Sequence, residues 1–194
     1  MRLVLFLMLI ISTSCSHKTT MDEKELYKFI RNEHNGLIKS KETEGFHLAM
    51  VWKPNDLIAR QQAIKGTKRE YDSLTKYFSN HLYFTLEMSY DGKDLETKFG
   101  SDLASFPDKI SFLSSGLSQN VQLKSKQDTL SPMECIYNRS YGIGISQCLI
   151  VFEKPKDNQF EVEVKGYPIG FGKQTFQFNL SDIENAPRLN TTFL

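Results

Sequence analysis

Short segments in which apolar and polar residues alternate dominate the second half of this chain. Phe160, Val162 and Val164 alternate with charged residues, and a period of two places one face of a strand against a core. The nearby run 148–152 is apolar on both faces, which is typical of a strand that has neighbours on both sides. Strands are therefore expected over residues 109–113, 121–126, 133–140, 147–154, 159–166 and 174–180.

The dipeptide Asp-Gly at positions 91–92 predicts a two-residue hairpin turn. Folding the chain at this turn would place Met88 opposite Leu95 and Phe84 opposite Phe99. Apolar residues would then meet on one face of the hairpin, so turn and register agree with each other.

The first half of the chain carries helical periodicity around a single strand. Helices are expected over residues 21–34, 56–64 and 67–78, and the strand over residues 46–52. Thr20 and Thr67 each stand three residues before a glutamate, which is the spacing of a capping box. Together these segments predict an α+β fold. Helices of the N-terminal half would pack on a twisted antiparallel sheet formed mainly by the C-terminal half.

The N-terminus has the layout of a secretory signal peptide. Arg2 precedes an apolar run, residues 3–11, that is far shorter than the roughly 20 residues a membrane-spanning helix needs. Small residues follow this run, and Cys15 comes directly after them. The stretch resembles the signal of Bacteroidota-type bacterial lipoproteins, with Ser12 in place of the commonest leucine.

This resemblance implies cleavage after residue 14 and acylation of Cys15, which would anchor the chain in a lipid bilayer. It places the protein in the bacterial cell envelope, with the outer membrane as the expected membrane. The alternative is ordinary secretion, with Cys15 left as a free thiol. The chain then divides into a signal peptide, residues 1–14, a short tether, residues 15–20, and one globular domain, residues 21–194.

The charge balance excludes a class of partner. Removal of the signal peptide removes Arg2 and no acidic residue, which leaves 23 basic and 23 acidic residues. Nucleic acid is not an expected partner, because its binding depends on an excess of positive charge.

Three residues are candidates for covalent modification besides Cys15. Cys135 and Cys148 form an even pair in a chain predicted to be exported, which favours a disulfide, although two buried thiols explain them equally well. Thr129 lies in the triplet Asp-Thr-Leu, which resembles the short O-glycosylation motif of exported Bacteroidota proteins.

No pattern of reaction chemistry stands out in the sequence. The four histidines, His17, His34, His47 and His81, have no ligand or base at the spacing of the common zinc-protease or serine-hydrolase motifs. We therefore assign no catalytic residue, no metal site and no cofactor. The single tryptophan, Trp52, is in phase with apolar residues of its strand and is expected in the core.

These features favour a non-enzymatic binding or scaffold component of the cell envelope that contacts another envelope protein. An exposed patch around Trp52 or residues 137–141 is the expected contact surface. One alternative is an inhibitor or immunity-type lipoprotein, whose deletion would sensitise cells to a toxin. Another is a hydrolase with a dispersed site, which would require a cleft that brings His47 or His81 beside a carboxylate.

Overall fold

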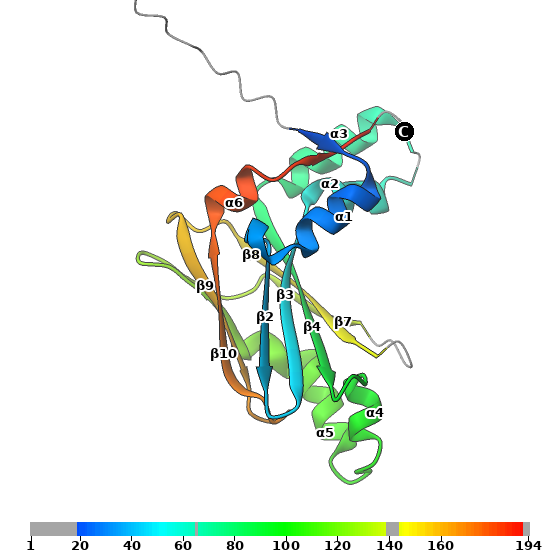
Figure 1. Ribbon diagram of the computed structural model, residues 1–194, viewed down its shortest axis with the longest axis vertical. Helices are drawn as coiled ribbons and strands as arrows, with labels where there is room; N and C mark the ends of the chain where they lie inside the picture. Colours follow the sequence, from blue (N-terminus) through cyan, green and yellow to red (C-terminus); the bar gives the residue numbers. More distant parts are fainter. Residues whose placement is uncertain (1–18, 65, 139–143, 192–194) are drawn as a thin grey trace, which may run out of the picture.

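Two antiparallel sheets form the centre of the fold, where the sequence predicts one. The computed structural model describes residues 19–64, 66–138 and 144–191 and confirms the α+β class (Figure 1). The larger sheet has the strand order β2-β3-β4-β8-β7, and the smaller sheet has the order β10-β9-β5-β6. A parallel pair of two-residue strands joins β1 to β11.

The strands have the following bounds: β1 Thr20–Met21, β2 Ile38–Thr43, β3 Phe46–Lys53, β4 His81–Tyr90, β5 Val121–Lys124, β6 Thr129–Leu130, β7 Glu134–Asn138, β8 Ser146–Glu153, β9 Gln159–Gly166, β10 Gly172–Asn179 and β11 Arg188–Leu189. The helices are α1 Glu23–Arg31, α2 Asn55–Gln62, α3 Lys68–Phe78, α4 Leu95–Phe99, α5 Phe106–Ser111 and α6 Leu180–Glu184. Short helical turns cover Glu33–Asn35, Phe112–Gly116 and Leu117–Asn120.

The two sheets share one apolar core. Phe84 of β4 contacts Phe160 of β9 and Phe178 of β10, with ring centroids 6.3 and 4.9 Å away. All three rings are almost fully buried. Because side chains alternate along each strand, the inner faces of both sheets fill this core, and the sheets are joined by apolar packing.

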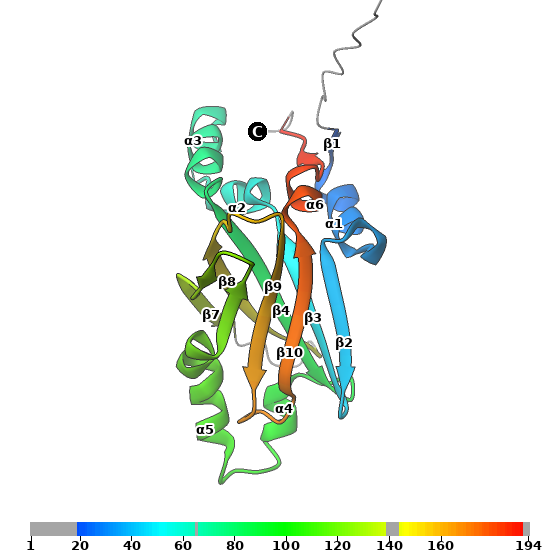
Figure 2. The ribbon, with the colours of Figure 1, turned by 90° about the vertical axis from the view of Figure 1, so that its left-hand side faces the viewer.

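The helices lie at the two ends of the sheets. α1, α2, α3 and α6 are at one end, and α4 and α5 are at the other (Figures 1 and 2). α2 and α3 pack a second apolar cluster, which includes Ile58 and Phe78, against Tyr83 and Val151 on the outer face of the larger sheet.

A partly buried ion pair connects the end of α1 to that same outer face. The Arg31 guanidinium donates two hydrogen bonds to the Glu87 carboxylate, one of them from Nη1 to Oε2 at 2.7 Å. Only 5% of Glu87 is exposed, and both of its carboxylate oxygens accept hydrogen bonds from Arg31. Loss of Arg31 would therefore leave a buried carboxylate without its compensating charge, which lowers the stability of the fold.

The two predicted capping boxes have different outcomes. Thr67 accepts a hydrogen bond from the Glu70 N–H and begins α3 as predicted. The prediction at Thr20 is wrong, because Asp22 caps α1 and forms the box with Glu25. Thr20 instead belongs to β1, whose backbone is paired with β11.

The hairpin predicted at residues 91–92 is also wrong. After the turn, only Tyr90 and Lys93 form a bridge, and Asp94 then caps helix α4 by accepting from the Thr97 N–H. Both sides of β4 are already paired, with β3 and with β8, so no place remains for a strand after the turn.

A buried polar cluster fixes α4 where the hairpin partner was expected. The Glu96 carboxylate accepts hydrogen bonds from the Tyr137 and Ser146 hydroxyls, and the Ser146 hydroxyl accepts from the Leu95 N–H. Glu96 is 3% exposed and Ser146 is fully buried. Since buried polar groups need partners, this cluster stabilises the helical path.

Two further elements differ from the prediction. The strand expected over residues 109–113 is helical, and its buried residues Ile110, Leu113 and Leu117 follow helical spacing. Strand β2 was not predicted. The remaining predicted strands of the second half match β5, β7, β8, β9 and β10 to within a few residues, and β8 is paired on both sides as expected.

Replacement of Phe84 by alanine should lower the free energy of unfolding by about 3–5 kcal/mol, because it opens a cavity where the two sheets meet. Chemical denaturation monitored by circular dichroism measures this loss. Leu103, which is 81% exposed, provides the control, since its replacement by alanine should change stability by no more than about 0.5 kcal/mol. Equal effects at both positions would contradict the assigned core.

Candidate binding seam

Each of the two main sheets ends in two edge strands, and these edges differ in how well they are covered. β7 lies against the helical turns of residues 112–120, and β6 is only two residues long. β2 and β10 are longer, with six and eight residues. Long edge strands carry rows of backbone groups without strand partners, and β2 and β10 are the longest edges of the two main sheets in the described part of the chain.

β2 and β10 run side by side without pairing (Figures 1 and 2). Their Cα atoms approach within 8 Å, whereas directly paired strands lie about 4.7–4.9 Å apart. No backbone hydrogen bond joins the two strands in the described part of the chain. We call this gap, bounded by Ile38–Thr43 and Gly172–Asn179, the seam.

The hydrogen bonds between β2 and β3 show which backbone groups of β2 point into the seam. The Trp52 N–H donates to the Leu37 carbonyl at 2.8 Å, one step beyond the register pair of Ile38 and Val51. Bonded and non-bonded pairs alternate in an antiparallel ladder. The backbone groups of Ile38, Ser40 and Glu42 therefore turn away from β3, toward the seam.

The same reasoning applies to β10. The Leu180 N–H donates to the Asn158 carbonyl at 2.6 Å, one step beyond the register pair of Asn179 and Gln159. The backbone groups of Asn179, Gln177 and Thr175 consequently turn away from β9. Two rows of available donors and acceptors thus border the same gap.

Two cavities open along the seam. The first has a volume of about 590 Å³, within the usual range of ligand pockets, and is lined by Glu33, Ile38, Lys39, Ser40, Lys41, Thr175, Phe176 and Gln177. The second, of about 480 Å³, lies at the end of the smaller sheet and shares Lys39 and Gln177 with the first. The two cavities are therefore neighbours, and Lys39 and Gln177 lie between them.

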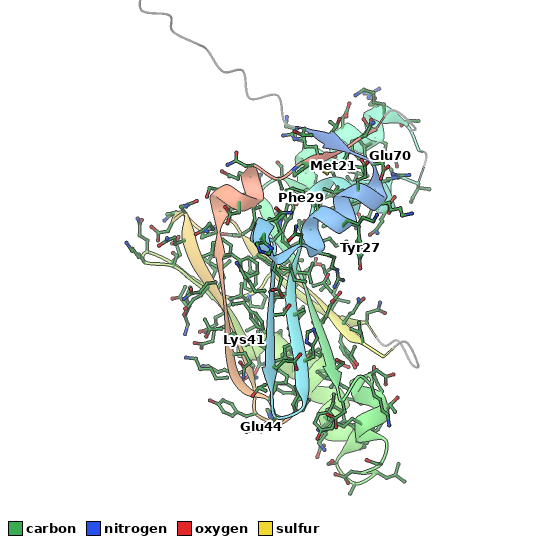
Figure 3. The ribbon with its side chains drawn as sticks, in the orientation of Figure 1. Met21, Tyr27, Phe29, Lys41, Glu44 and Glu70 are labelled. Atoms are coloured by element: carbon green, nitrogen blue, oxygen red, sulfur yellow. The ribbon has the colours of Figure 1, made fainter. Side chains whose placement is uncertain are left out.

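Lysines occupy the positions of β2 where an apolar residue would be expected. Lys39 and Lys41 are in register with the buried residues Met50 and Leu48, so their stems lie on the inner face. The Lys39 ammonium lies 6.0 Å from the Phe178 ring and the Lys41 ammonium 5.8 Å from the Phe176 ring. Figure 3 labels Lys41 where β2 passes β10. These side chains cover the core with their stems and bring positive charge to the seam.

A second cationic group lies on the outer face of the smaller sheet. Lys124 and Lys173 place their ammonium groups 2.9 and 2.6 Å from Oε2 of Glu163, which is 2% exposed. Their hydrogen bonds to the carboxylate, Lys173 first, lower the pKa of Glu163 to about 2. Glu163 therefore stays ionised at neutral pH and compensates part of this charge. Lys124 also lines the second cavity of the seam.

The residues singled out in the sequence do not gather at one place. Cys15 lies outside the described residues, so its acylation stays a prediction. Thr129 is exposed on β6, and its glycosylation stays a prediction as well. The core position of Trp52 is confirmed, since 7% of the residue is exposed.

The contact surface predicted around residues 137–141 is described at two positions only. Tyr137 is half-buried, and its hydroxyl donates to Glu96 at 2.6 Å, whereas Asn138 is exposed. Residues 139–141 lie outside the described residues, so this surface stays a prediction. The seam is a candidate site that was not predicted from the sequence.

His47 and His81 occupy separate places in the described part of the chain. His47 is exposed on β3, and its Nδ1 lies 2.6 Å from Oε1 of Glu42. His81 lines a third cavity, of about 150 Å³, together with Asp56 and Glu184. The His81 Nδ1 atom is buried and has no hydrogen-bond partner among the described residues.

The described residues contain neither a metal-binding cluster nor a helix that could span a membrane. Across residues 19–64, 66–138 and 144–191, no three His, Cys, Asp or Glu side chains are grouped so that they could hold a metal ion. None of the helices described is both long enough and apolar enough to cross a membrane.

Comparison with known proteins adds little. No family model matches the sequence, and no curated protein matches it. The chain is similar to the crystal structure of a DUF4426 family protein from Pseudomonas aeruginosa, with 12% identity and a TM-score of 0.36. The match covers 73% of this chain and 93% of that one. This likeness is too weak to indicate a shared function.

Cys135 and Cys148 are free thiols in contact, with their sulfur atoms 3.2 Å apart. They lie on the inner face of neighbouring strands, because Cys135 pairs with Ile150 and Cys148 with Tyr137. The hydrogen bond between the two sulfurs lowers the pKa of Cys135 and raises that of Cys148. The contact makes a bridge geometrically accessible.

We predict that the protein isolated from an oxidising compartment carries the Cys135–Cys148 disulfide. Non-reducing peptide mapping should recover the two cysteine peptides linked. Because the bridge would close a loop of 13 residues, reduction should lower the free energy of unfolding by about 3 kcal/mol. The Cys148→Ala variant should lose this redox dependence. Two alkylatable thiols in the native, unreduced protein would contradict the prediction.

Proposed function

We propose that this protein is a lipid-anchored, non-enzymatic component of the bacterial cell envelope that binds another envelope protein along the seam. The observation that carries the proposal is the pair of uncovered edges, β2 and β10, on either side of one groove. Backbone edges that lack strand partners favour association with another polypeptide. The lipoprotein-like signal at Cys15 supports the location.

The position of the described N-terminus is compatible with an anchor. β1 lies at the end of the molecule that carries α1, α2 and α3 (Figure 2). Residues 16–19 would separate an acylated Cys15 from β1, a span of about 15 Å when fully extended. This end of the fold would then face the bilayer closely, and the seam would lead away from it.

The proposal predicts a partner that depends on both the anchor and the seam. In-cell crosslinking of the tagged native protein, followed by purification from its own membranes, should recover one stoichiometric envelope protein. The Cys15→Ala variant should lose it, because the chain is no longer held at the membrane. Lys41→Glu should reduce recovery by about tenfold, because it reverses a charge inside the groove.

Lys76→Glu is the matched control for that charge change. Lys76 is exposed on α3, outside the seam, and its reversal should leave recovery unchanged. Recovery of the acylated protein without any crosslinked partner would argue against the binding function. Equal losses with Lys41→Glu and Lys76→Glu would argue against the seam as the contact surface.

One observation favours a second candidate, a hydrolase of envelope polymers. The 150 Å³ cavity has His81, Asp56 and Glu184 in its lining, which places an imidazole and two carboxylates in one concave site. However, the Asp56 carboxylate already accepts the Leu189 N–H at 3.1 Å. Release of soluble fragments from purified peptidoglycan, abolished by His81→Ala, would establish this activity. If the native protein releases no soluble fragments from peptidoglycan, the hydrolase function is wrong.

A further inference from the structure

We infer that the occupant of the seam is an extended polypeptide segment that pairs as a strand with β2 and β10 and carries acidic side chains at alternate positions. The inference rests on the proposed binding function and specifies the chemistry of the partner. Three independent features of the described residues support it: the lack of backbone pairing between the two edges, the direction of the backbone groups, and the sign of the charge.

A single strand can enter the seam only where β2 and β10 move apart. Insertion of one strand between them requires about two interstrand steps, close to 9.5 Å. Some Cα atoms of the two edges lie within 8 Å of each other, so these parts of the seam must widen. No backbone hydrogen bond of the described residues has to break during this opening. The contacts that must shift there include those of Lys39 and Lys41 with the rings beneath them.

The backbone groups of both edges are directed toward the same gap. Ser40 on β2 and Gln177 on β10 belong to the alternate residues whose N–H and C=O groups turn away from β3 and β9. An inserted strand would satisfy both rows. Only main-chain groups of a polypeptide repeat at the spacing of these rows, so a strand fits this edge better than a small ligand does.

The charge of the groove selects among extended segments. Lys39 and Lys41 are two residues apart and share one face of β2. A neighbouring strand with this period would place every second side chain beside them. Acidic residues at those positions would pair with the two ammonium groups, whereas lysine or arginine would be repelled.

The direction of the inserted strand also follows from the fold. β2 and β10 point in opposite directions along the molecule (Figures 1 and 2). A strand between them is therefore antiparallel to one edge and parallel to the other. It would join the two sheets into one continuous hydrogen-bonded surface on this side of the core.

A displayed library of random peptides, each about ten residues long, tests the inference with the full mature chain as bait. The expected result is enrichment of segments with Asp or Glu at every second position. A selected peptide, labelled with fluorescein, should bind in an anisotropy titration. Its affinity should fall by about tenfold or more when its alternate amides are N-methylated, because these amides supply the hydrogen bonds to the edge.

Proline substitutions on the protein provide the complementary test. Ser40→Pro and Gln177→Pro each remove one N–H that faces the seam and leave the ladders to β3 and β9 intact. Each should weaken peptide binding by about tenfold, whereas Ser40→Ala and Gln177→Ala should not. Thermal unfolding of the four variants establishes that they fold, and amide hydrogen exchange of the native protein should show protection of Ser40 and Gln177 on peptide binding.

Several outcomes would overturn the inference. These are a library without enriched acidic segments, a selected peptide that tolerates N-methylation, or equal binding to the proline and alanine variants. A concentration-dependent dimer that is lost in Ser40→Pro would also overturn it, because a second copy of the chain would then occupy the edge. If crosslinking recovers an envelope partner that tolerates both proline variants, the binding function stands and the strand-pairing inference fails.

Discussion

The contact of Phe84 with Phe160 and Phe178 determines much of the architecture, because it joins two sheets that share no strand and no backbone ladder. Apolar packing is non-directional, so it fixes the distance between the sheets without closing their edges. The larger sheet can then end at β2 and the smaller sheet at β10 while their inner faces remain buried together. The seam exists because the two sheets are joined by packing of their inner faces and not by pairing of β2 with β10.

Lysines at the inner positions of β2 serve two purposes in this arrangement. Inward-pointing charges on an edge strand discourage pairing with other copies of the same chain, because the partner would have to bury them. The same charges make the edge selective for a partner with compensating carboxylates. In the proposed complex, Lys39 and Lys41 would thus keep the edge free of unwanted neighbours and select the segment that it accepts.

The sequence predicts the α+β class and most strands of the second half, because their periodicity reports burial directly. It does not predict β2, whose inner positions are lysines and therefore lack the apolar alternation that reveals a strand. The seam is missed for the same reason. The turn at residues 91–92 is correctly located, but the next segment becomes α4 because the Glu96 cluster and the two occupied sides of β4 depend on residues distant in sequence.

The parallel pair of β1 and β11 has a mechanical consequence. It includes two hydrogen bonds, from the Arg188 N–H to the Thr19 carbonyl at 3.0 Å and from the Asn190 N–H to the Met21 carbonyl at 2.7 Å. In a chain tethered at Cys15, any tension from the bilayer would reach this pair of strands before it reached the core. Separation of β1 from β11 would lengthen the tether and leave the two sheets and the seam folded. This pair would therefore separate first under force and protect the rest of the fold from unfolding.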